Sequence, residues 1–307
     1  MIYLYLSGGL GNQLFQYAYA RAMQKYTGDS VTYLEESYKT DELRDLSLNK
    51  FDIAQDWVSD ATYNFWNNHK VLHFYYRTFE KIERIRGKKI AGDLPDKNYI
   101  KKQKKYFKKG IYVHENHAYI APDFKTHAKD KYIRGLWHHP MYFDHIKETL
   151  IDEFCLKDTS VLPAELISDI QLQNSVCVHI RRGDYVNYSY YIVCDIDYYN
   201  RAIEEMRKQK PGCHFFVFSD DIAWVKDNIK SSDDITYVEE SHPDYIDFEL
   251  MRNCNHFIIS NSTFSWWAAY LGQASDKLVM TPDKWYNDGR NKEQLNLPEW
   301  MVMKTNI

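Results

Sequence analysis

The sequence lacks several features that would place it in a common protein class. Its 307 residues contain five cysteines, at positions 155, 177, 194, 213 and 254, and no Cys-x-x-Cys pair. This spacing supports neither a zinc site nor a dithiol redox site. An odd number of scattered cysteines is typical of reduced thiols in a cytosolic protein.

Long apolar runs are also missing. No stretch approaches the roughly 18 consecutive apolar residues that a transmembrane helix needs, so we expect no membrane span. The N-terminus has no basic region, and Gly8 and Gly9 end its short apolar run, which argues against a signal peptide. We therefore expect a cytoplasmic protein that is at most peripheral on the inner face of the membrane.

The charge balance excludes another class. A net charge of −4 argues against a general nucleic-acid binder. The lysine-rich run 101–109 is typical of a solvated loop or helix face, and contact with an anionic membrane surface is the alternative.

What the sequence has is length and aromatic side chains. A chain of 307 residues, 16% of them aromatic and 26 of them Tyr, can form one large domain or two of about 150 residues. Tyrosine also suits polar, sugar-lined clefts, because its ring packs while its hydroxyl forms hydrogen bonds.

The second half alternates between strand and helix patterns. We predict strands at 176–181, 214–218, 235–238, 256–260 and 277–281, and helices at 164–172, 196–209, 222–229, 243–253 and 264–271. Strands separated by helices of this length indicate a doubly wound parallel sheet.

The first half begins in the same way. We predict a strand at 2–6, a glycine loop, a helix that ends near Tyr26 before Gly28, and a strand at 31–34. Further strands are expected at 111–113, 117–120 and 132–136, and a helix at 141–154. Residues 43–110 are rich in charged and aromatic residues and are predicted to form helices and loops in an order that the sequence does not define, and 87–110 are predicted to be an exposed loop. A polar link at 158–163 predicts a domain boundary.

Two adjacent arginines follow the predicted strand at 176–181. His179, Arg181, Arg182 and Asp184 lie within six residues at its carboxyl end, where ligands bind in open α/β sheets. A guanidinium is always charged, so each needs an anion or a carboxylate partner. The pattern fits a phosphate site or a salt-bridged surface turn.

Three other strand-to-helix turns contain ligand-type residues. Asn261, Ser262, Thr263 and Ser265 could bind a phosphate at a helix N-terminus, or simply cap the helix. Asp220 and Asp221 could cap a helix or accept hydrogen bonds from a nucleobase. The loop around Gly9 and Gly11 permits close approach of a ligand, but Leu14 replaces the third glycine of a dinucleotide fingerprint, which disfavours a nicotinamide oxidoreductase. The absence of Gly-Lys-Ser/Thr excludes a P-loop.

Metal sites are weakly indicated. Asp195-Ile-Asp197 matches a short Asp-x-Asp pattern, but a capping role for Asp195 is the stronger interpretation. His138 and His139 lack a third ligand at suitable spacing and are interpreted as surface residues.

Together, the motifs resemble those of family 11 α-1,2-fucosyltransferases of the bacterial type. The resemblance rests on Gly-Gly-Leu-Gly-Asn-Gln-Leu-Phe-Gln-Tyr-Ala (8–18), His-Ile-Arg-Arg-Gly-Asp-Tyr (179–185), Phe-Ser-Asp-Asp (218–221) and Asn-Ser-Thr-Phe-Ser-Trp-Trp (261–267). The motifs occur in the family's order, and residues 135–143 resemble its mid-chain segment loosely.

The resemblance implies an α/β fold of the GT-B type, with two Rossmann-like domains facing across a cleft. It implies an acceptor-side domain at 1–158, a GDP-fucose-binding domain at 159–290, and a tail at 291–307 that packs back on the first domain. Fucose would pass, with inversion and without a metal or other cofactor, from GDP-fucose to the 2-hydroxyl of a β-galactoside on a glycan acceptor.

The resemblance also implies roles for individual residues. His179 would contact the guanine or ribose, Arg181 the diphosphate, and Asn12 the fucose and the acceptor, while Arg182 and Asp184 would organise the site. Asp184 is also our candidate base. The remaining donor-binding candidates are Asp220, Asp221, Asn261, Ser262, Thr263, Ser265, Gly9 and Gly11. Two rival hypotheses are a GT-B enzyme that uses another nucleotide sugar and a non-catalytic protein that binds nucleotide sugars or glycans.

Overall fold

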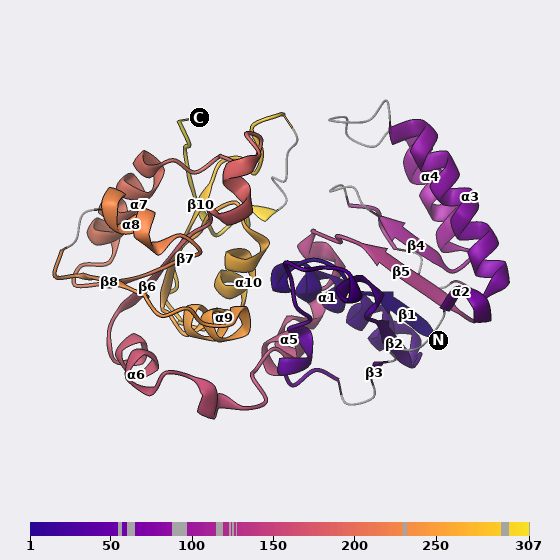
Figure 1. Cartoon of the computed structure of the whole chain (residues 1–307), viewed down its shortest axis with the longest axis horizontal. Coiled ribbons are helices and arrows are strands. Elements are labelled where there is room, and N and C mark those ends of the chain that lie inside the picture. Colours follow the sequence, from indigo (N-terminus) through magenta and orange to yellow (C-terminus); the bar gives the residue numbers. More distant parts are fainter. Residues whose placement is uncertain are drawn as a thin grey trace. The chain divides into compact units, whose positions relative to one another are not determined.

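The computed structural model describes residues 1–54, 57–59, 65–87, 97–114, 119–122, 124, 126, 128–229, 232–289 and 295–306. The chain divides into two compact units, Met1–Phe154 and Cys155–Ile307. Each unit contains a parallel sheet with helices packed on it (Figure 1). The division lies close to residue 158, where we expected the domain boundary.

The first unit has a five-stranded sheet in the order β3-β2-β1-β5-β4, with all pairs parallel. Its strands are β1 Ile2–Tyr5, β2 Val31–Leu34, β3 Trp57–Ser59, β4 Ile111–His114 and β5 Lys131–Gly135. Its α-helices are α1 Leu10–Thr27, α2 Phe65–Asn68, α3 Lys70–Gly87, α4 Lys97–Phe107 and α5 Lys147–Glu153. Short 3₁₀ turns occupy Glu36–Lys39, Leu48–Lys50, Pro140–Tyr142 and Asp144–Ile146.

The predictions for the start of this unit are confirmed. A strand, a glycine turn and a helix follow one another, and Gly28 ends α1 with φ 70° in the left-handed conformation that glycine favours. α1 is buried on nearly all sides. Its glutamines therefore need internal hydrogen-bond partners, which bear on the site below.

Two predictions for this unit are wrong. The expected loop at 87–110 contains α4, which buries Gln103, Tyr106 and Phe107 while Lys101, Lys104 and Lys105 are exposed. The expected helix at 141–154 is shorter, because the backbone of Phe143 (φ −142°) separates two 3₁₀ turns and leaves α5 as the only α-helical part. The expected strand at 117–120 falls partly outside the described residues, and Tyr119 and Ile120 form no strand.

The second unit has a six-stranded sheet in the order β11-β10-β9-β6-β7-β8, also parallel throughout. Its strands are β6 Ser175–Ile180, β7 His214–Ser219, β8 Ile235–Tyr237, β9 His256–Ile258, β10 Val279–Pro282 and β11 Met301–Met303. Its α-helices are α6 Ala164–Leu172, α7 Ile196–Gln209, α8 Ile222–Asn228, α9 Asp244–Arg252 and α10 Thr263–Leu271. The predicted doubly wound alternation is confirmed.

The tail differs from its prediction. We expected residues 291–307 to pack back on the first domain, but β11 pairs with β10, with Met280 opposite Met301 and Pro282 opposite Met303. This part of the tail therefore extends the sheet of the second unit. A three-residue strand is too short to be recognised from alternation.

Both sheets have a switch point where the order of strands reverses. In the first unit it lies between β1 and β5, and in the second between β6 and β9. Ligands of open α/β sheets bind beyond the carboxyl ends of strands at such points. In the part of the chain that the structure describes, no helix is long and apolar enough to cross a membrane.

Candidate active site

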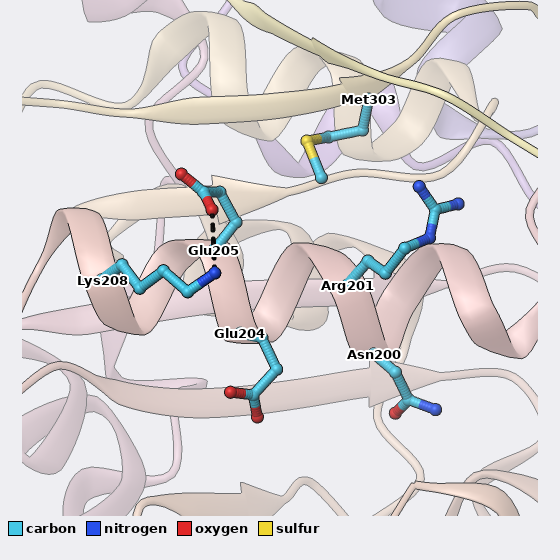
Figure 2. A pocket seen from close by; sticks show the side chains of 6 residues that line it. All are labelled: Asn200, Arg201, Glu204, Glu205, Lys208 and Met303. Atoms are coloured by element: carbon cyan, nitrogen blue, oxygen red, sulfur yellow. Dashed lines mark hydrogen bonds and ion pairs between the residues drawn. The ribbon is translucent and has the colours of Figure 1, made fainter.

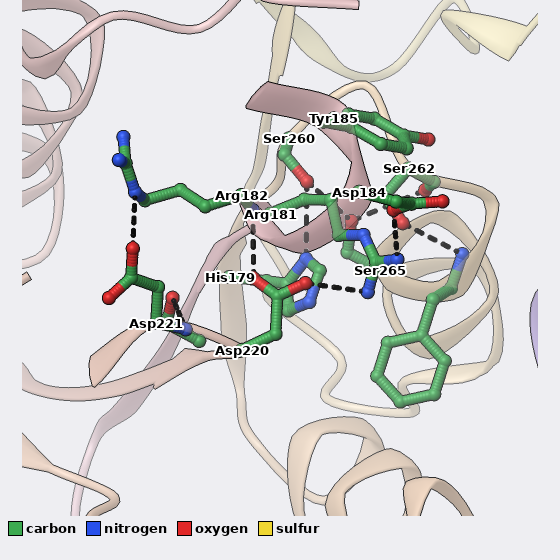
Figure 3. Close-up of polar contacts among 12 residues, drawn as sticks. His179, Arg181, Arg182, Asp184, Tyr185, Asp220, Asp221, Ser260, Ser262 and Ser265 are labelled. Carbon is green, nitrogen blue, oxygen red and sulfur yellow. Dashed lines mark hydrogen bonds and ion pairs between the residues drawn. The ribbon is translucent and has the colours of Figure 1, made fainter. Parts of the chain in front are cut away.

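Charged and polar side chains gather beyond the carboxyl ends of β6, β7 and β9 in the second unit. Figure 3 shows that the arginines following β6 point toward aspartates following β7, and that His179 points toward a serine following β9. The structure thus brings together residues that are up to 86 positions apart, from His179 to Ser265.

Arg181 lies between two carboxylates. Its Nη2 is 2.5 Å from Asp184 Oδ1, and its Nη1 is 2.7 Å from Asp220 Oδ2. Burial acts to lower the pKa of Arg181, but the charges of Asp220 and Asp184 outweigh burial and raise it. These two contacts use two of the five guanidinium N–H donors, so the group can still bind an anionic ligand.

Arg182 turns the other way and forms a separate ion pair. Its Nε donates to Asp221 Oδ2 at 2.9 Å, and its guanidinium lies 3.6 Å from the ring centre of Trp224. The hydrogen bond from Arg182 lowers the pKa of Asp221, whose carboxylate also accepts from the Trp224 N–H and caps α8. Arg182 and Asp221 thereby join the turn after β6 to the N-terminus of α8.

The backbone of the arginine turn is fixed as well. Asp220 Oδ1 accepts a hydrogen bond from the Arg182 N–H at 2.8 Å, while its other oxygen pairs with Arg181. A side chain at Gly183 would overlap the Asp220 carboxylate, with a Cβ only 3.1 Å from Asp220 Cγ. Glycine is therefore required here because a carboxylate occupies the space that a Cβ would fill.

His179 is buried and neutral. Its Nδ1 lies 3.1 Å from Ser260 Oγ, and its ring packs 5.5 Å from that of Phe264. Burial, assisted by the nearby charge of Arg181, lowers the pKa of His179 to about 3. A neutral imidazole can both donate and accept one hydrogen bond, which suits recognition of an uncharged base or sugar.

The N-terminus of α10 adjoins this cluster. Ser262 caps the helix by accepting from the Phe264 N–H at 3.3 Å, and the buried Ser265 donates to the Ser262 carbonyl at the same distance. Capping by Ser262 is thus confirmed. Thr263 is half-buried beside it. The nine-residue helix also directs its positive end toward the cluster, which favours an anion there.

The side chain of Asn261 holds two loops together. Its Nδ2 donates to the carbonyls of Tyr191 and Trp285, at 3.1 and 3.0 Å, and its Oδ1 receives the Cys194 thiol. Tyr191 in turn stacks on Tyr185 at 4.4 Å. The Asn261 amide therefore joins the loop 185–194 to the loop after β10, and its role toward the donor stays a prediction.

In the first unit, Gly9, Gly11 and Asn12 lie at the start of α1. Gly9 is the N-cap with φ −70°, a conformation open to any residue, whereas Gly8 has φ 78° and a Cβ there would overlap the Asn12 amide. The nearest atom to a Cβ at Gly9 would be Arg44 Cδ at 3.9 Å, so the backbone there is open to a ligand. Their roles toward donor and acceptor stay predictions.

Buried amides hold this turn. Gln13 accepts from the N–H groups of Ser47 and Leu48 and donates to the carbonyls of Gly8 and Asp45. Gln16 pairs with the backbone of Ser7 through both its oxygen and its nitrogen.

His138 was wrongly interpreted as a surface residue. It is 4% exposed, and its Nε2 lies 3.0 Å from Asn12 Oδ1. It follows Trp137, the one described non-glycine residue with positive φ, at 53°. Strain of this kind concentrates at functional sites. No local sequence pattern could have predicted this contact, because Asn12 and His138 are 126 residues apart.

The structure supports the capping interpretation of Asp195, which accepts from the Tyr198 N–H at 2.7 Å. Among the described residues, no group of three or more His, Cys, Asp or Glu is placed to hold a metal ion. A hollow of about 410 Å³ lies beside α7 and β11 and is lined by Asn200, Arg201, Glu204, Glu205, Lys208 and Met303 (Figure 2). Glu205 and Lys208 pair with each other at 3.4 Å, and none of these residues belongs to the cluster at the strand ends.

Comparison with known protein families matches residues 1–304 to the family described as "Glycosyl transferase family 11". The chain belongs to this family. Glycosyltransferase family 11 therefore accounts for nearly the whole chain, both units included.

Curated relatives of this family 11 chain come from bacteria and animals. It is 28% identical to "O-antigen biosynthesis glycosyltransferase WbnK" of Escherichia coli, over 98% of this chain and 99% of the relative. It is 31% identical to "Alpha-1,2-colitosyltransferase" of Escherichia coli, over 95% and 93%. It is 30% identical to human "Galactoside alpha-(1,2)-fucosyltransferase 1", over 54% of this chain and 50% of the relative.

Among solved structures, the fucosyltransferase NodZ from Bradyrhizobium matches with a TM-score of 0.50 at 15% identity, over 87% of this chain and 90% of that one. At this identity the similarity shows the fold. The family 11 chain thus has a GT-B type fold built of two Rossmann-like units.

Proposed function

We propose that this glycosyltransferase moves L-fucose from GDP-β-L-fucose to the 2-hydroxyl of a terminal β-galactoside on a glycan acceptor, with inversion at the anomeric carbon. The observation that supports it best is the placement of Arg181. This arginine lies at the switch point of the second sheet, close to the N-terminus of α10, with N–H donors to spare.

The donor assignment follows from charge. A nucleoside diphosphate sugar is anionic, and its β-phosphate gains charge as the bond to the sugar breaks. Arg181 and the α10 N-terminus can stabilise that charge in a partly dry site, where such contacts contribute several kcal/mol. His179 is held neutral and suits the guanosine part. We propose that Ser262, Thr263 and Ser265 complete the phosphate site.

The reaction breaks the bond between the anomeric carbon of fucose and the β-phosphate oxygen. A bond forms from the acceptor 2-hydroxyl oxygen to the opposite face of that carbon, and the hydroxyl loses its proton. Asp184 is the proposed base, although in the structure it pairs with Arg181 and must give up or share that contact. Asn12 is proposed to orient the fucose and the acceptor.

The acceptor assignment draws on the relatives. Two of them are named for α-1,2 transfer, and the human one is named for a galactoside. We propose the same linkage here. We also propose that transfer needs no metal, so that saturating EDTA should leave turnover unchanged.

A second donor has a specific observation in its favour. The relative that is 31% identical over 95% of this chain is named a colitosyltransferase. Colitose is fucose without its 3-hydroxyl, so one hydrogen bond in the sugar pocket distinguishes the two. A site built to bind that hydroxyl would reject the deoxy sugar strongly, whereas an apolar site would accept both.

The deciding experiment incubates the chain with GDP-fucose or GDP-colitose and a lactose-type β-galactoside. GDP release is measured, and the product linkage is determined by NMR. We expect an α-1,2-fucosylated product and competition by GDP but not by UDP or ADP. Inhibition by UDP or ADP instead would indicate another nucleotide sugar. Binding of GDP-fucose without GDP release would indicate a non-catalytic binding protein.

A further inference from the structure

Two helices of the first unit, α3 and α4, lie side by side (Figure 1). Their inner faces pack together through the rings of Phe79 and Tyr106, 5.1 Å apart. Leu72, Tyr76 and Phe79 of α3 also belong to the core formed with β1, β4 and β5. Leu72, Tyr76 and Phe79 are therefore buried because they pack in the core of the first unit.

The outer side of α3 is unusual for a surface helix. Val71 and Phe74 are each 69% exposed and lie one turn apart. Basic residues surround them on the same exposed face, which we name the α3 stripe: Lys70, Val71, Phe74, Arg77 and Lys81. An exposed Phe and Val flanked by cations is the pattern of a helix that lies in a membrane interface.

The lysines of α4 extend this surface. Lys101, Lys104, Lys105 and Lys108 are exposed and repeat at helical spacing, and we name them the α4 lysines. Lys109 follows them with its Nζ 4.2 Å from the ring centre of Tyr75, the neighbour of Phe74. Lys109, at the end of this basic run, thus contacts α3 beside Phe74.

The charge of this surface is opposite to that of the whole chain. The segments 70–82 and 100–109 contain nine Lys or Arg and one acidic residue, Glu80, in a chain with a net charge of −4. Each Lys or Arg near an anionic bilayer contributes about 1 kcal/mol, and apolar side chains add binding by leaving water.

We propose that the α3 stripe and the α4 lysines dock the protein onto an anionic lipid bilayer. The lysines contact phosphate head groups, while Phe74 and Val71 enter the boundary between head groups and acyl chains. A nucleic acid would match the charge but would leave Phe74 and Val71 in water, so the apolar residues favour the bilayer. This docking does not depend on the proposed sugar transfer.

The test is flotation of the full-length chain with phosphatidylcholine vesicles that contain either no anionic lipid or roughly one-third phosphatidylglycerol. We expect binding to the anionic vesicles alone. A chain that floats equally with neutral vesicles, or with neither kind, overturns the proposal.

Two variants and a matched control separate the contributions. Changing the four α4 lysines to Gln is expected to weaken partitioning by roughly a thousandfold, because each lysine contributes about 1 kcal/mol. Changing four exposed lysines elsewhere (Lys50, Lys129, Lys157 and Lys208) to Gln removes the same charge and should weaken partitioning less than about threefold in total. Equal losses in the two quadruple variants would show unspecific adhesion.

Phe74→Ser tests the apolar contact. We expect roughly tenfold weaker partitioning that is also more sensitive to salt, with unchanged thermal stability because the ring is exposed in the folded chain. If Phe74→Ser binds vesicles as the wild type does while the chain binds RNA as tightly as vesicles, the surface is a polyanion site instead. Unchanged transfer to a free oligosaccharide in all these variants would show that docking and catalysis are separate.

Discussion

The two switch points occupy equivalent places in their sheets but differ in chemistry. In the first unit, the ends of β1 and β5 are joined by a contact between the Asn12 amide and the His138 ring, with no carboxylate or guanidinium in that contact. In the second, the ends of β6 and β9 are joined by His179 and Ser260, and charged pairs around Arg181 are added. Neutral amides suit a neutral glycan, and guanidinium groups suit a diphosphate, so the difference matches the proposed division between acceptor and donor.

The largest effect is expected from removing the charge of the second switch point. Arg181→Ala should lower kcat by about a thousandfold, because the leaving phosphate loses its main cationic partner. Purified protein is assayed for GDP release, and circular dichroism checks folding. The control is Arg207→Ala, which breaks a comparable pair with Asp234 (2.6 Å) on the surface and should retain activity. Near wild-type turnover in Arg181→Ala would refute the phosphate assignment.

The next largest effect on activity is expected from substitutions in the turns that contain Gly183 and Gly9. Gly183→Ala should lower kcat/KM about a hundredfold, because the new Cβ displaces the Asp220 carboxylate and with it Arg181. Gly9→Ala has room for its Cβ and should keep its melting temperature. If Gly9→Ala loses activity at unchanged stability, a ligand approaches that backbone closely. Full activity in Gly183→Ala would mean that the arginine turn tolerates movement.

A smaller effect is expected from removing the contact between His138 and Asn12 in the first unit. His138→Ala should lower kcat roughly tenfold with little change in KM for the donor, because Asn12 loses the partner that orients its amide. His138→Gln, which can still donate to Asn12 Oδ1, should restore much of the loss. A rise in donor KM instead would connect Asn12 to the donor alone.

The smallest expected effect is a change in how the stability of the protein depends on pH. The folded pKa of His179 is about 3, below the usual 6.5, so below pH 6.5 the unfolded chain binds the proton more readily. The stability of the wild type relative to His179→Gln should therefore be greatest above pH 6.5. It should fall by roughly 1 kcal/mol per pH unit as the pH drops toward 3. Urea unfolding at pH 7.5 and 5 measures the difference, and a constant difference would show that His179 is not held neutral.

The second unit was more predictable than the first. Its strands are short apolar runs between caps and glycines, so α6 and α7 were predicted at Ala164–Leu172 and Ile196–Gln209, as observed. In the first unit, the many lysines of α4 obscured the helical spacing of its buried residues Gln103, Tyr106 and Phe107. Local patterns define elements well only where one face is clearly apolar.

The sequence predicted which types of residue form the site, but not which side chains pair with each other. The arginine motif required anionic partners, yet the sequence could not show that Asp184 and Asp220 share Arg181 or that Asp221 takes Arg182. The pairing of His138 with Asn12 depends on β1 and β5 being neighbours, which is a property of sheet order and not of any local pattern. The sequence also could not show that the Asn261 amide joins two loops, because its partners Tyr191 and Trp285 are far from it in the chain.

The pairing of β11 with β10 has a consequence for synthesis of the chain on the ribosome. Every other strand of the second sheet is made earlier, but the outer edge of β10 stays uncovered until Met301–Met303 has emerged. An open strand edge is a template for pairing with other chains. We therefore expect the unfinished chain to be more prone to aggregation than the finished one, and a chaperone that shields strand edges to raise its yield.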